Sequence, residues 1–208
     1  MQNEHPKEQV LVISTGLATA LCNYQVFGPP SPILEKIILE NHSFRERQEA
    51  ETNFSFKQVI PYVVVSAPLR PGVLAYLLTQ RTNQQQESRL HNKYSIGQGG
   101  HINDLDFKSD TTNQSPILVG LMREIKEEFH LDGISTCEPV GVLNDDSNEV
   151  SRVHLGLVYR VHVVSQYLEV AEHGKHTAQW ATASELEGYY ANMERWSQIV
   201  MEHVIRAA

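Results

Sequence analysis

The sequence predicts one α/β domain, of the α+β kind, built around a mixed β-sheet. Apolar runs typical of strands lie on both sides of a single central helical segment, and a second helical segment ends the chain. Strands and helices do not alternate regularly, which argues against a doubly wound parallel sheet. The 208 residues suffice for one domain with an extension and a sizeable core.

The N-terminal part, residues 1–57, is predicted to be an extension that packs on the core domain, residues 58–208. Within the extension, residues 10–14 form a short β-branched run typical of a strand. Residues 33–40 have apolar side chains at helical spacing. The polar residues 42–53 allow either a helix or a loop. No low-complexity linker separates the extension from the core domain.

The core domain is predicted to begin with a β-hairpin. Residues 59–66 and 73–80 read as strands, and the Pro71-Gly72 pair between them is a strong turn signal. The polar residues 81–93 are predicted to be an exposed loop. A short strand over residues 94–97 then enters a glycine cluster, Gly97-Gln98-Gly99-Gly100.

A central helix is predicted over residues 117–129, after a polar loop at 101–113. Ser115 suits the N-cap and Pro116 the first helical position, while Asp132-Gly133 should stop the helix. Strands at 139–143 and 150–164 follow, joined by an acidic loop. An amphipathic helix is expected over residues 183–206. This helix and the N-terminal extension are each able to form the interface of a homodimer.

Composition and charge exclude several classes of function. The hydrophobic content of 41% and charged content of 20% are those of an ordinary globular protein. The net charge of -8 argues against binding of nucleic-acid polymers, because affinity for their phosphates comes from Lys and Arg. An acidic enzyme can still bind small phosphorylated molecules where divalent cations bridge the two negative partners.

Targeting signals are not evident in the sequence. Residues 1–9 are polar and lack the apolar region of a signal peptide, and no run reaches the length of a membrane span. Cys22 and Cys137 are too few for a disulfide framework. We therefore expect a cytoplasmic protein that has no membrane partner.

Grouped carboxylates on the central helix are the main functional signal. At about 100° per residue, Glu124, Glu127 and Glu128 fall within a narrow arc, and Arg123 is placed to pair with Glu127. Such carboxylates repel one another unless a cation lies among them, and their hard oxygen atoms suit Mg²⁺ or Mn²⁺. The alternative is an ordinary solvated acidic helix face.

The glycine cluster upstream favours the metal interpretation. Gly99 and Gly100 follow a predicted strand and allow backbone N–H groups to approach an anion closely. A glycine loop followed by a helix with grouped carboxylates is a much rarer combination than either feature alone.

Together these residues resemble the signature motif, or box, of the Nudix hydrolase superfamily. The matching residues are Gly99-Gly100-His101-Ile102 and Arg123-Glu124-Ile125-Lys126-Glu127-Glu128, with Leu131 as the last aliphatic residue. The resemblance covers about residues 59–206 and implies an α/β/α sandwich with a mixed sheet. The residues GGHIN at 99–103, HLG at 154–156 and ERWS at 194–197 are similar to a subgroup of larger predicted phosphoesterases in that superfamily.

The resemblance also implies roles for individual residues. Glu124, Glu127 and Glu128 match the glutamates that bind divalent metals, with Glu127 and Glu128 central to catalysis, and Arg123 matches the arginine that orients one of them. Two departures stand out: the segment from Gly100 to Arg123 is longer than in the box, and His130 replaces a glycine.

The upstream glutamate of the box is also missing. Ser115 occupies its position, so that Asp104, Asp106 or Asp110 becomes a candidate substitute.

Further candidates lie outside the box. Asp146 and Glu149, in the acidic loop 144–149, are preferred as the base that takes a proton from water, although an exposed acidic turn is the alternative. His101 is a candidate phosphate contact. His154 is a candidate for lining the substrate cleft, with a hydrogen-bonded structural histidine as its alternative.

Weaker candidates lie near the C-terminus or pair with helix residues. Glu172 is a possible extra ligand. The pairs Glu127 with His130 and His173 with His176 have metal-ligand spacing but lack the companion ligands that iron or zinc sites need. The aromatic residues near the C-terminus suit packing or stacking on a substrate ring: Trp180, Tyr189, Tyr190 and Trp196.

Two functions follow from these residues. The first is hydrolysis of a phosphoanhydride in a phosphorylated small molecule by metal-activated water. The second is a catalytically weak or inactive module that binds and senses a nucleotide or another metabolite. The intact glutamate pair favours the enzyme, whereas Ser115 and the longer box loop motivate the sensor. The sequence does not name the substrate, because loops shape the pocket in such a fold.

Overall fold

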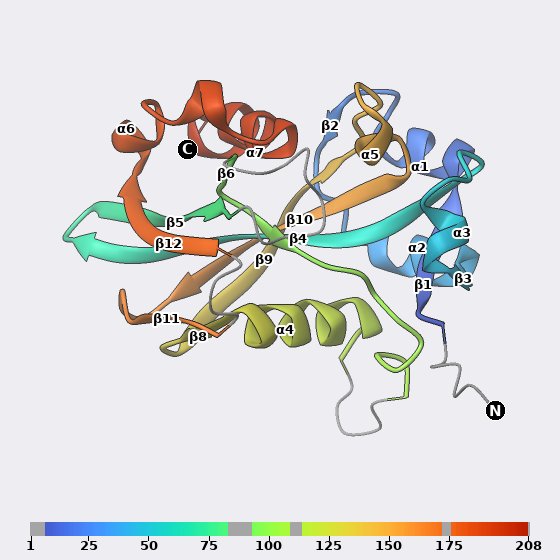
Figure 1. Cartoon of the computed structure of the whole chain (residues 1–208), viewed down its shortest axis with the longest axis horizontal. Coiled ribbons are helices and arrows are strands. Elements are labelled where there is room, and N and C mark those ends of the chain that lie inside the picture. Colours follow the sequence, from blue (N-terminus) through green and yellow to red (C-terminus); the bar gives the residue numbers. More distant parts are fainter. Residues whose placement is uncertain (1–6, 83–92, 109–113, 172–175, 208) are drawn as a thin grey trace. The chain divides into compact units, whose positions relative to one another are not determined.

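The computed structural model of the chain describes residues 7–82, 93–108, 114–171 and 176–207. The chain forms two compact units, each assembled from separate stretches of sequence. Unit 1 comprises Met1–Pro61, Gly100–Met122 and Gly141–Val158, and unit 2 comprises Tyr62–Gly99, Arg123–Val140 and Tyr159–Ala208. The elements that run from one unit into the other are β4 (Phe56–Arg70), α4 (Pro116–Glu128), β9 (Ile134–Leu143) and β10 (His154–Val163) (Figure 1).

Unit 1 contains the predicted N-terminal extension. Its remaining elements are β1 (Gln9–Ser14), α1 (Thr15–Leu21), β2 (Phe27–Gly28), α2 (Leu34–Asn41), β3 (Ser43–Glu46), α3 (Arg47–Ala50) and α5 (Glu149–Arg152). The strand and the helix predicted in the extension are confirmed as β1 and α2. β1 pairs antiparallel with β3 and with the start of β4. Buried Val10, Val12 and Ala50 pack with Phe56, which joins α3 to this strand pair.

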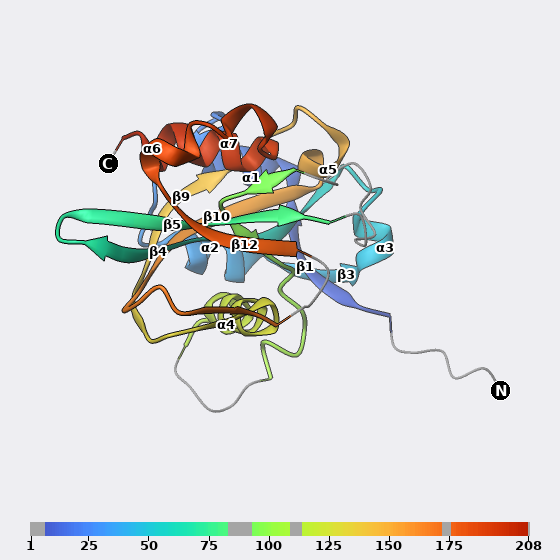
Figure 2. The same ribbon diagram turned by 60° about the vertical axis from the view of Figure 1, so that its left-hand side comes forward.

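Unit 2 combines long strands with short helices near the C-terminus. Its remaining elements are β5 (Val73–Arg81), β6 (Tyr94–Ser95), β7 (Gln98–Gly99), β8 (Phe129–Leu131), β11 (Leu168–Val170), β12 (His176–Thr182), α6 (Ala183–Leu186), a 3-10 turn (Tyr190–Asn192), α7 (Arg195–Val200) and a π turn (Met201–Ile205). β12 pairs with β5 along its whole length. Figures 1 and 2 show α6 and α7 on one side of this pair and β11 on the other.

The described strands form a large mixed sheet, which confirms the predicted α/β class. Its main order is β12-β5-β4-β10-β9-β2, with β1 and β7 also paired to β4, β3 to β1, and β6 to β5. A separate two-stranded ribbon joins β8 and β11. The predicted hairpin is confirmed as β4 and β5, and Gly72 in its turn has a φ of 74°, which glycine adopts without strain. Within the described part of the chain, no helix is long and apolar enough to span a membrane.

The strand predicted over residues 150–164 was wrong at its start. Residues 149–152 form the short helix α5, and the strand begins only at His154. Asn148 caps the helix, because its side-chain oxygen accepts a hydrogen bond of 2.9 Å from the backbone N–H of Ser151. This local bond outweighs the alternation of apolar residues that suggested a strand.

The single helix predicted over residues 183–206 was also wrong, because the segment is divided between α6, a 3-10 turn, α7 and a π turn. A capping box between Thr182 and Glu185 begins α6 as expected of a helix start. The chain then becomes extended at Met193, and the backbone N–H of Glu194 donates to the carbonyl of Tyr94 at 2.8 Å. A contact with a segment distant in sequence therefore interrupts the helix.

The central helix begins as predicted, at Pro116, but ends earlier than predicted, at Glu128. Residues 129–131 leave the helix to form β8, which pairs with β11 through Phe129 and Val170, among others. Gly133, the predicted stop, lies beyond this strand with a φ of 44°. Strand pairing therefore sets the end of α4.

Candidate active site

The helix α4 carries the carboxylates singled out by the sequence. Ser115 Oγ accepts a hydrogen bond of 3.3 Å from the N–H of Ile117, which helps to begin the helix. A buried stripe then repeats every four residues, at Ile117, Leu121 and Ile125, and continues to Phe129. This stripe fixes the rotation of α4, so that the carboxylates of the last turns lie away from the core.

Arg123, Glu124 and Glu127 form one cluster on α4. The Arg123 Nη1 atom donates to Glu124 Oε1 at 2.7 Å and lies 3.4 Å from Glu127 Oε2. The Glu127 side chain is 56% exposed, whereas that of Glu124 is 21% exposed. Glu128 is half-buried, and its backbone carbonyl accepts a hydrogen bond from Ala171 at 2.9 Å. The predicted pairing of Arg123 with Glu127 is thus present, and Arg123 also binds Glu124.

The donor chemistry of this cluster fits a divalent cation. Two carboxylates already share one positive charge, since Glu124 and Glu127 approach the same guanidinium nitrogen. Mg²⁺ prefers carboxylate oxygens and usually takes only a few protein ligands beside water and substrate phosphates. Among the described side chains, no three His, Cys, Asp or Glu residues are already gathered in a metal-binding arrangement.

The glycine cluster has a packing role that the sequence analysis missed. A Cβ atom on Gly97 would lie 2.0 Å from Cε1 of Tyr62, whose ring covers this position. Gly99 lies opposite Tyr62 in the pairing of β7 with β4. Residues 94–99 therefore form two short strands, β6 and β7, where the sequence predicted one.

His101 and His154, predicted independently as substrate contacts, lie together in unit 1. Their ring centroids are 5.6 Å apart. His154 Nδ1 donates to the carbonyl of Val150 at 2.6 Å, a contact typical of the structural histidine that the sequence left as an alternative. Burial lowers the pKa of His154, although the hydrogen bond to Val150 and the charge of Glu51 act in the opposite direction.

The lowered pKa of His154 predicts a loss of stability in mild acid. The unfolded chain, with a histidine pKa near 6.5, binds a proton that native His154 resists, so the free energy of unfolding falls as pH drops below that value. Urea denaturation at about pH 7.5 and about pH 5.5 measures this difference. We expect His154→Gln to reduce the pH dependence, whereas the same change at exposed His130 should leave it unchanged. An equal pH dependence in native and His154→Gln proteins would contradict the prediction.

The acidic loop is more ordered than an exposed acidic turn. Asp145 is buried, and its carboxylate accepts hydrogen bonds from the N–H and the Oγ of Ser147 at 3.2 and 2.7 Å. Asp146 Oδ1 lies 2.7 Å from the Nζ atom of the buried Lys57. Glu149 is the exposed first residue of α5. The preferred base candidates therefore have different environments: Asp146 is ion-paired, and Glu149 opens a helix.

The candidate substitutes for the upstream glutamate are distinguished by burial. Asp106 is 4% exposed, accepts a hydrogen bond from the N–H of Asn103 at 2.9 Å, and lies beside Gly120 of α4. Asp104 forms an exposed pair with Lys108. Asp110 lies outside the described residues. Asp106 is thus the candidate held against α4, where it also fills the space beside a glycine.

The remaining candidates are mostly packing residues. Trp180 Nε1 donates to the carbonyl of Gln166 at 2.8 Å, Tyr189 packs on Tyr94 and Trp196 on Tyr62. Tyr190 donates a hydrogen bond to Glu202. Glu172 and His173 lie outside the described residues, as does the side chain of His176. Neither Cys22 nor Cys137 forms a disulfide.

Comparisons with known proteins cover most of the chain. No family model matches it. Protein YmaB of Bacillus subtilis (strain 168) is 32% identical over 184 residues, which span 85% of this chain and 86% of YmaB. The crystal structure of Tm1382, proposed to be a Nudix hydrolase, is 30% identical and covers 97% of this chain and 100% of its own, with a TM-score of 0.80.

More distant structures share the fold. The Nudix domain of Shewanella oneidensis NrtR, crystallised with ADP ribose, is 13% identical, covers 73% of this chain and 88% of its own, and has a TM-score of 0.55. A mutT/nudix family protein from Listeria innocua is 16% identical, covers 72% of this chain and 92% of its own, and has a TM-score of 0.52.

Proposed function

Because this chain belongs to the Nudix hydrolase superfamily, we propose that it hydrolyses a phosphoanhydride in a small phosphorylated molecule with the help of a divalent cation. The observation that carries this proposal is the approach of Glu124 and Glu127 to the same nitrogen of Arg123 on α4. A solvated acidic face would not require its carboxylates to share a cation in this way.

In this proposal the carboxylates of Glu124, Glu127 and Glu128 hold Mg²⁺ or Mn²⁺. When bound, the cation supplies polarisation of the phosphoryl oxygen and a lowered pKa for water. Arg123 keeps Glu124 and Glu127 in orientation through the contacts at 2.7 and 3.4 Å. A guanidinium suits this role because it stays protonated and offers donors in a rigid plane.

Other residues act on the substrate and on the proton. Gly99 and Gly100 allow backbone N–H groups to approach the phosphates, as glycines do in anion-binding loops. His101 and His154 contact the substrate from unit 1, where their rings are neighbours. Asp146 or Glu149 takes the proton of the attacking water as general base.

A second candidate function is ligand binding without turnover. Ser115 occupies the position of the upstream glutamate, and its hydroxyl oxygen contributes to the start of α4 and supplies no carboxylate. A Nudix fold can bind a nucleotide derivative, as the NrtR domain does with ADP ribose. This alternative predicts ligand binding that does not depend on a divalent cation.

Phosphate release distinguishes the two functions. We expect ADP-ribose, nucleoside triphosphates or nucleotide sugars to be cleaved only when Mg²⁺ or Mn²⁺ is supplied, and cleavage to stop on addition of a chelator. The products are resolved by chromatography, which also identifies the bond that breaks. Binding of a panel compound without cleavage, at equal affinity with and without the cation, would refute the enzyme and favour the sensor.

A further inference from the structure

A lysine that the sequence analysis did not single out lies fully buried beside the acidic loop. Lys57 is the second residue of β4, and its side chain has 0% exposure. A buried ammonium group is costly unless it is ion-paired and hydrogen-bonded. The surroundings of Lys57 must therefore supply acceptors.

The Lys57 ammonium reaches three points of one segment. Nζ donates to Asp146 Oδ1 at 2.7 Å and to the backbone carbonyls of Ser151 and His154, each at 3.4 Å. An ammonium has three N–H donors, so these acceptors can account for all of them. The three acceptors lie before, within and after α5. One side chain therefore holds the whole segment 146–154.

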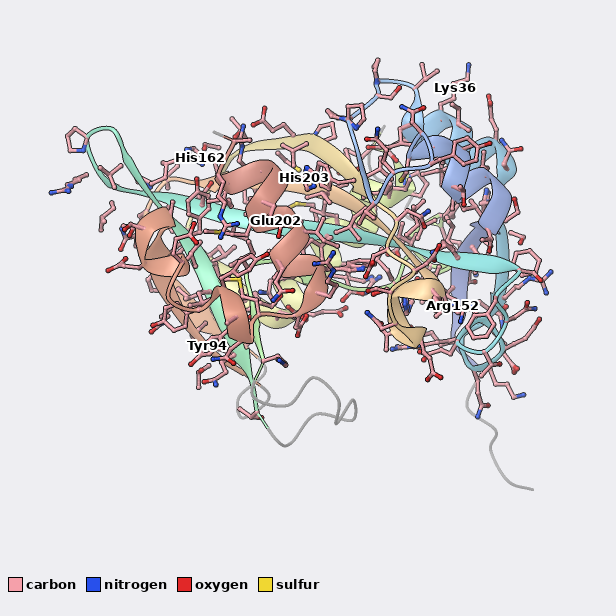
Figure 3. The ribbon with its side chains drawn as sticks, turned by 90° about the horizontal axis from the view of Figure 1, so that it is seen from above. Lys36, Tyr94, Arg152, His162, Glu202 and His203 are labelled. Carbon is pink, nitrogen blue, oxygen red and sulfur yellow. The ribbon has the colours of Figure 1, made fainter. Side chains whose placement is uncertain are left out.

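Other contacts close the same segment around Lys57. Asn148 caps α5 through the N–H of Ser151, and the Asn148 Nδ2 atom donates to Ser151 Oγ at 2.9 Å. Arg152, labelled in Figure 3, lies with its guanidinium carbon 4.5 Å above the ring of Phe54. The segment is thus fixed to the chain just before and within β4 at both a charged and an aromatic contact.

The two base candidates in this segment are unequal. Asp146 contributes its Oδ1 atom to the ion pair with Lys57, and this contact holds the loop. Glu149 follows the Asn148 cap as the first residue of α5 and is exposed. A carboxylate that anchors a buried cation is poorly suited to gain a proton in each turnover, because protonation would leave that cation unpaired.

We infer that Lys57 is a positioning residue that fixes the acidic segment through Asp146, so that Glu149 and not Asp146 serves as the general base. This inference rests on the proposed hydrolase function. Lys57 and Asp146 act through the segment and do not touch the substrate, whereas Glu149 accepts the proton of the attacking water.

The test combines hydrogen exchange with kinetics. Asp146→Asn removes the ion pair from its exposed side, and Lys57→Met removes it from the buried side. Asp146→Asn keeps the test valid if Lys57→Met does not fold. Glu138→Gln is the control, because it breaks another exposed ion pair, with Arg160, in β9 and β10. Glu149→Gln tests the base itself.

We expect the amides of residues 147–153 to exchange about tenfold faster in Asp146→Asn and not in the control. The kcat should fall on the order of tenfold while KM changes little, as expected when a catalytic group is misplaced without loss of binding. The acidic limb of the pH–rate profile should persist in Asp146→Asn and disappear in Glu149→Gln, because that limb reports the base.

Two results would overturn the inference. Unchanged exchange in Asp146→Asn would show that the ion pair does not hold the segment. Loss of the acidic limb in Asp146→Asn, with retention in Glu149→Gln, would make Asp146 the base. If the native protein cleaved no compound, the proposed function and the role of Glu149 would fail together, and exchange would still decide whether Lys57 anchors the segment.

Discussion

Replacing Glu127 by glutamine is expected to reduce kcat/KM by about a thousandfold, or about 4 kcal/mol of transition-state stabilisation. The amide keeps the size of the side chain but loses the negative charge that binds a divalent cation. Glu127 is more exposed than Glu124 or Arg123, so the substitution should leave the fold intact. Initial rates at saturating Mg²⁺, compared between variant and native protein, measure the effect.

The chain offers a matched control for Glu127. Glu40 is also a helical glutamate paired with a cation four residues earlier, Lys36, and its side chain is 60% exposed, close to the 56% of Glu127. Glu40→Gln should therefore change kcat/KM by less than about twofold. A similar loss in both variants would indicate a general effect of removing charge. Full activity of Glu127→Gln would contradict the proposed metal site.

Replacing Gly97 by alanine is expected to destabilise the protein by about 3 kcal/mol. The new Cβ would lie 2.0 and 2.1 Å from Cε1 and Cζ of Tyr62. That ring has little room to move, because its hydroxyl is 2.8 Å from Ser197 Oγ and its face packs against Trp196. The collision involves a buried ring and has no solvent side to relieve it. The free energy of unfolding in urea measures the loss.

Gly16 provides the comparison for this substitution. It lies in α1, and a Cβ built there has no atom within 4 Å. Gly16→Ala should therefore be neutral or stabilise the protein by up to about 1 kcal/mol, since alanine favours helices. If Gly97→Ala were as stable as the native protein, Tyr62 would have to be free to move, and the packing role assigned to Gly97 would be incorrect.

Local signals in the sequence were sufficient for much of the fold. The Pro71-Gly72 pair located the β4–β5 hairpin, and Ser115-Pro116 located the start of α4. The errors arose where contacts distant in sequence decide the structure. The terminal helix is interrupted by the bond between Glu194 and Tyr94, which no local pattern announces.

The candidate site was predictable to a similar extent. The motif identified the α4 carboxylates, and their contacts with Arg123 follow from helical spacing. The neighbourhood of His101 and His154 and the packing of Gly97 against Tyr62 depend on tertiary structure. Lys57 did leave a signal, as a charged residue between Phe56 and the apolar run that follows. Its partner Asp146, however, lies far along the chain.

The interleaved composition of the two units has a consequence for biosynthesis. Each unit draws on three stretches of chain, and unit 1 is complete only when Gly141–Val158 has been made. A nascent chain that ends before Gly141 therefore carries β1, β3 and β4 with no β10 to pair with. Such exposed strand edges invite association with other chains. The last strand, β12, must in turn find β5 after the entire intervening sequence has left the ribosome. We therefore expect the full-length chain to fold post-translationally, with a greater need for chaperones than a protein of the same size made from consecutive domains.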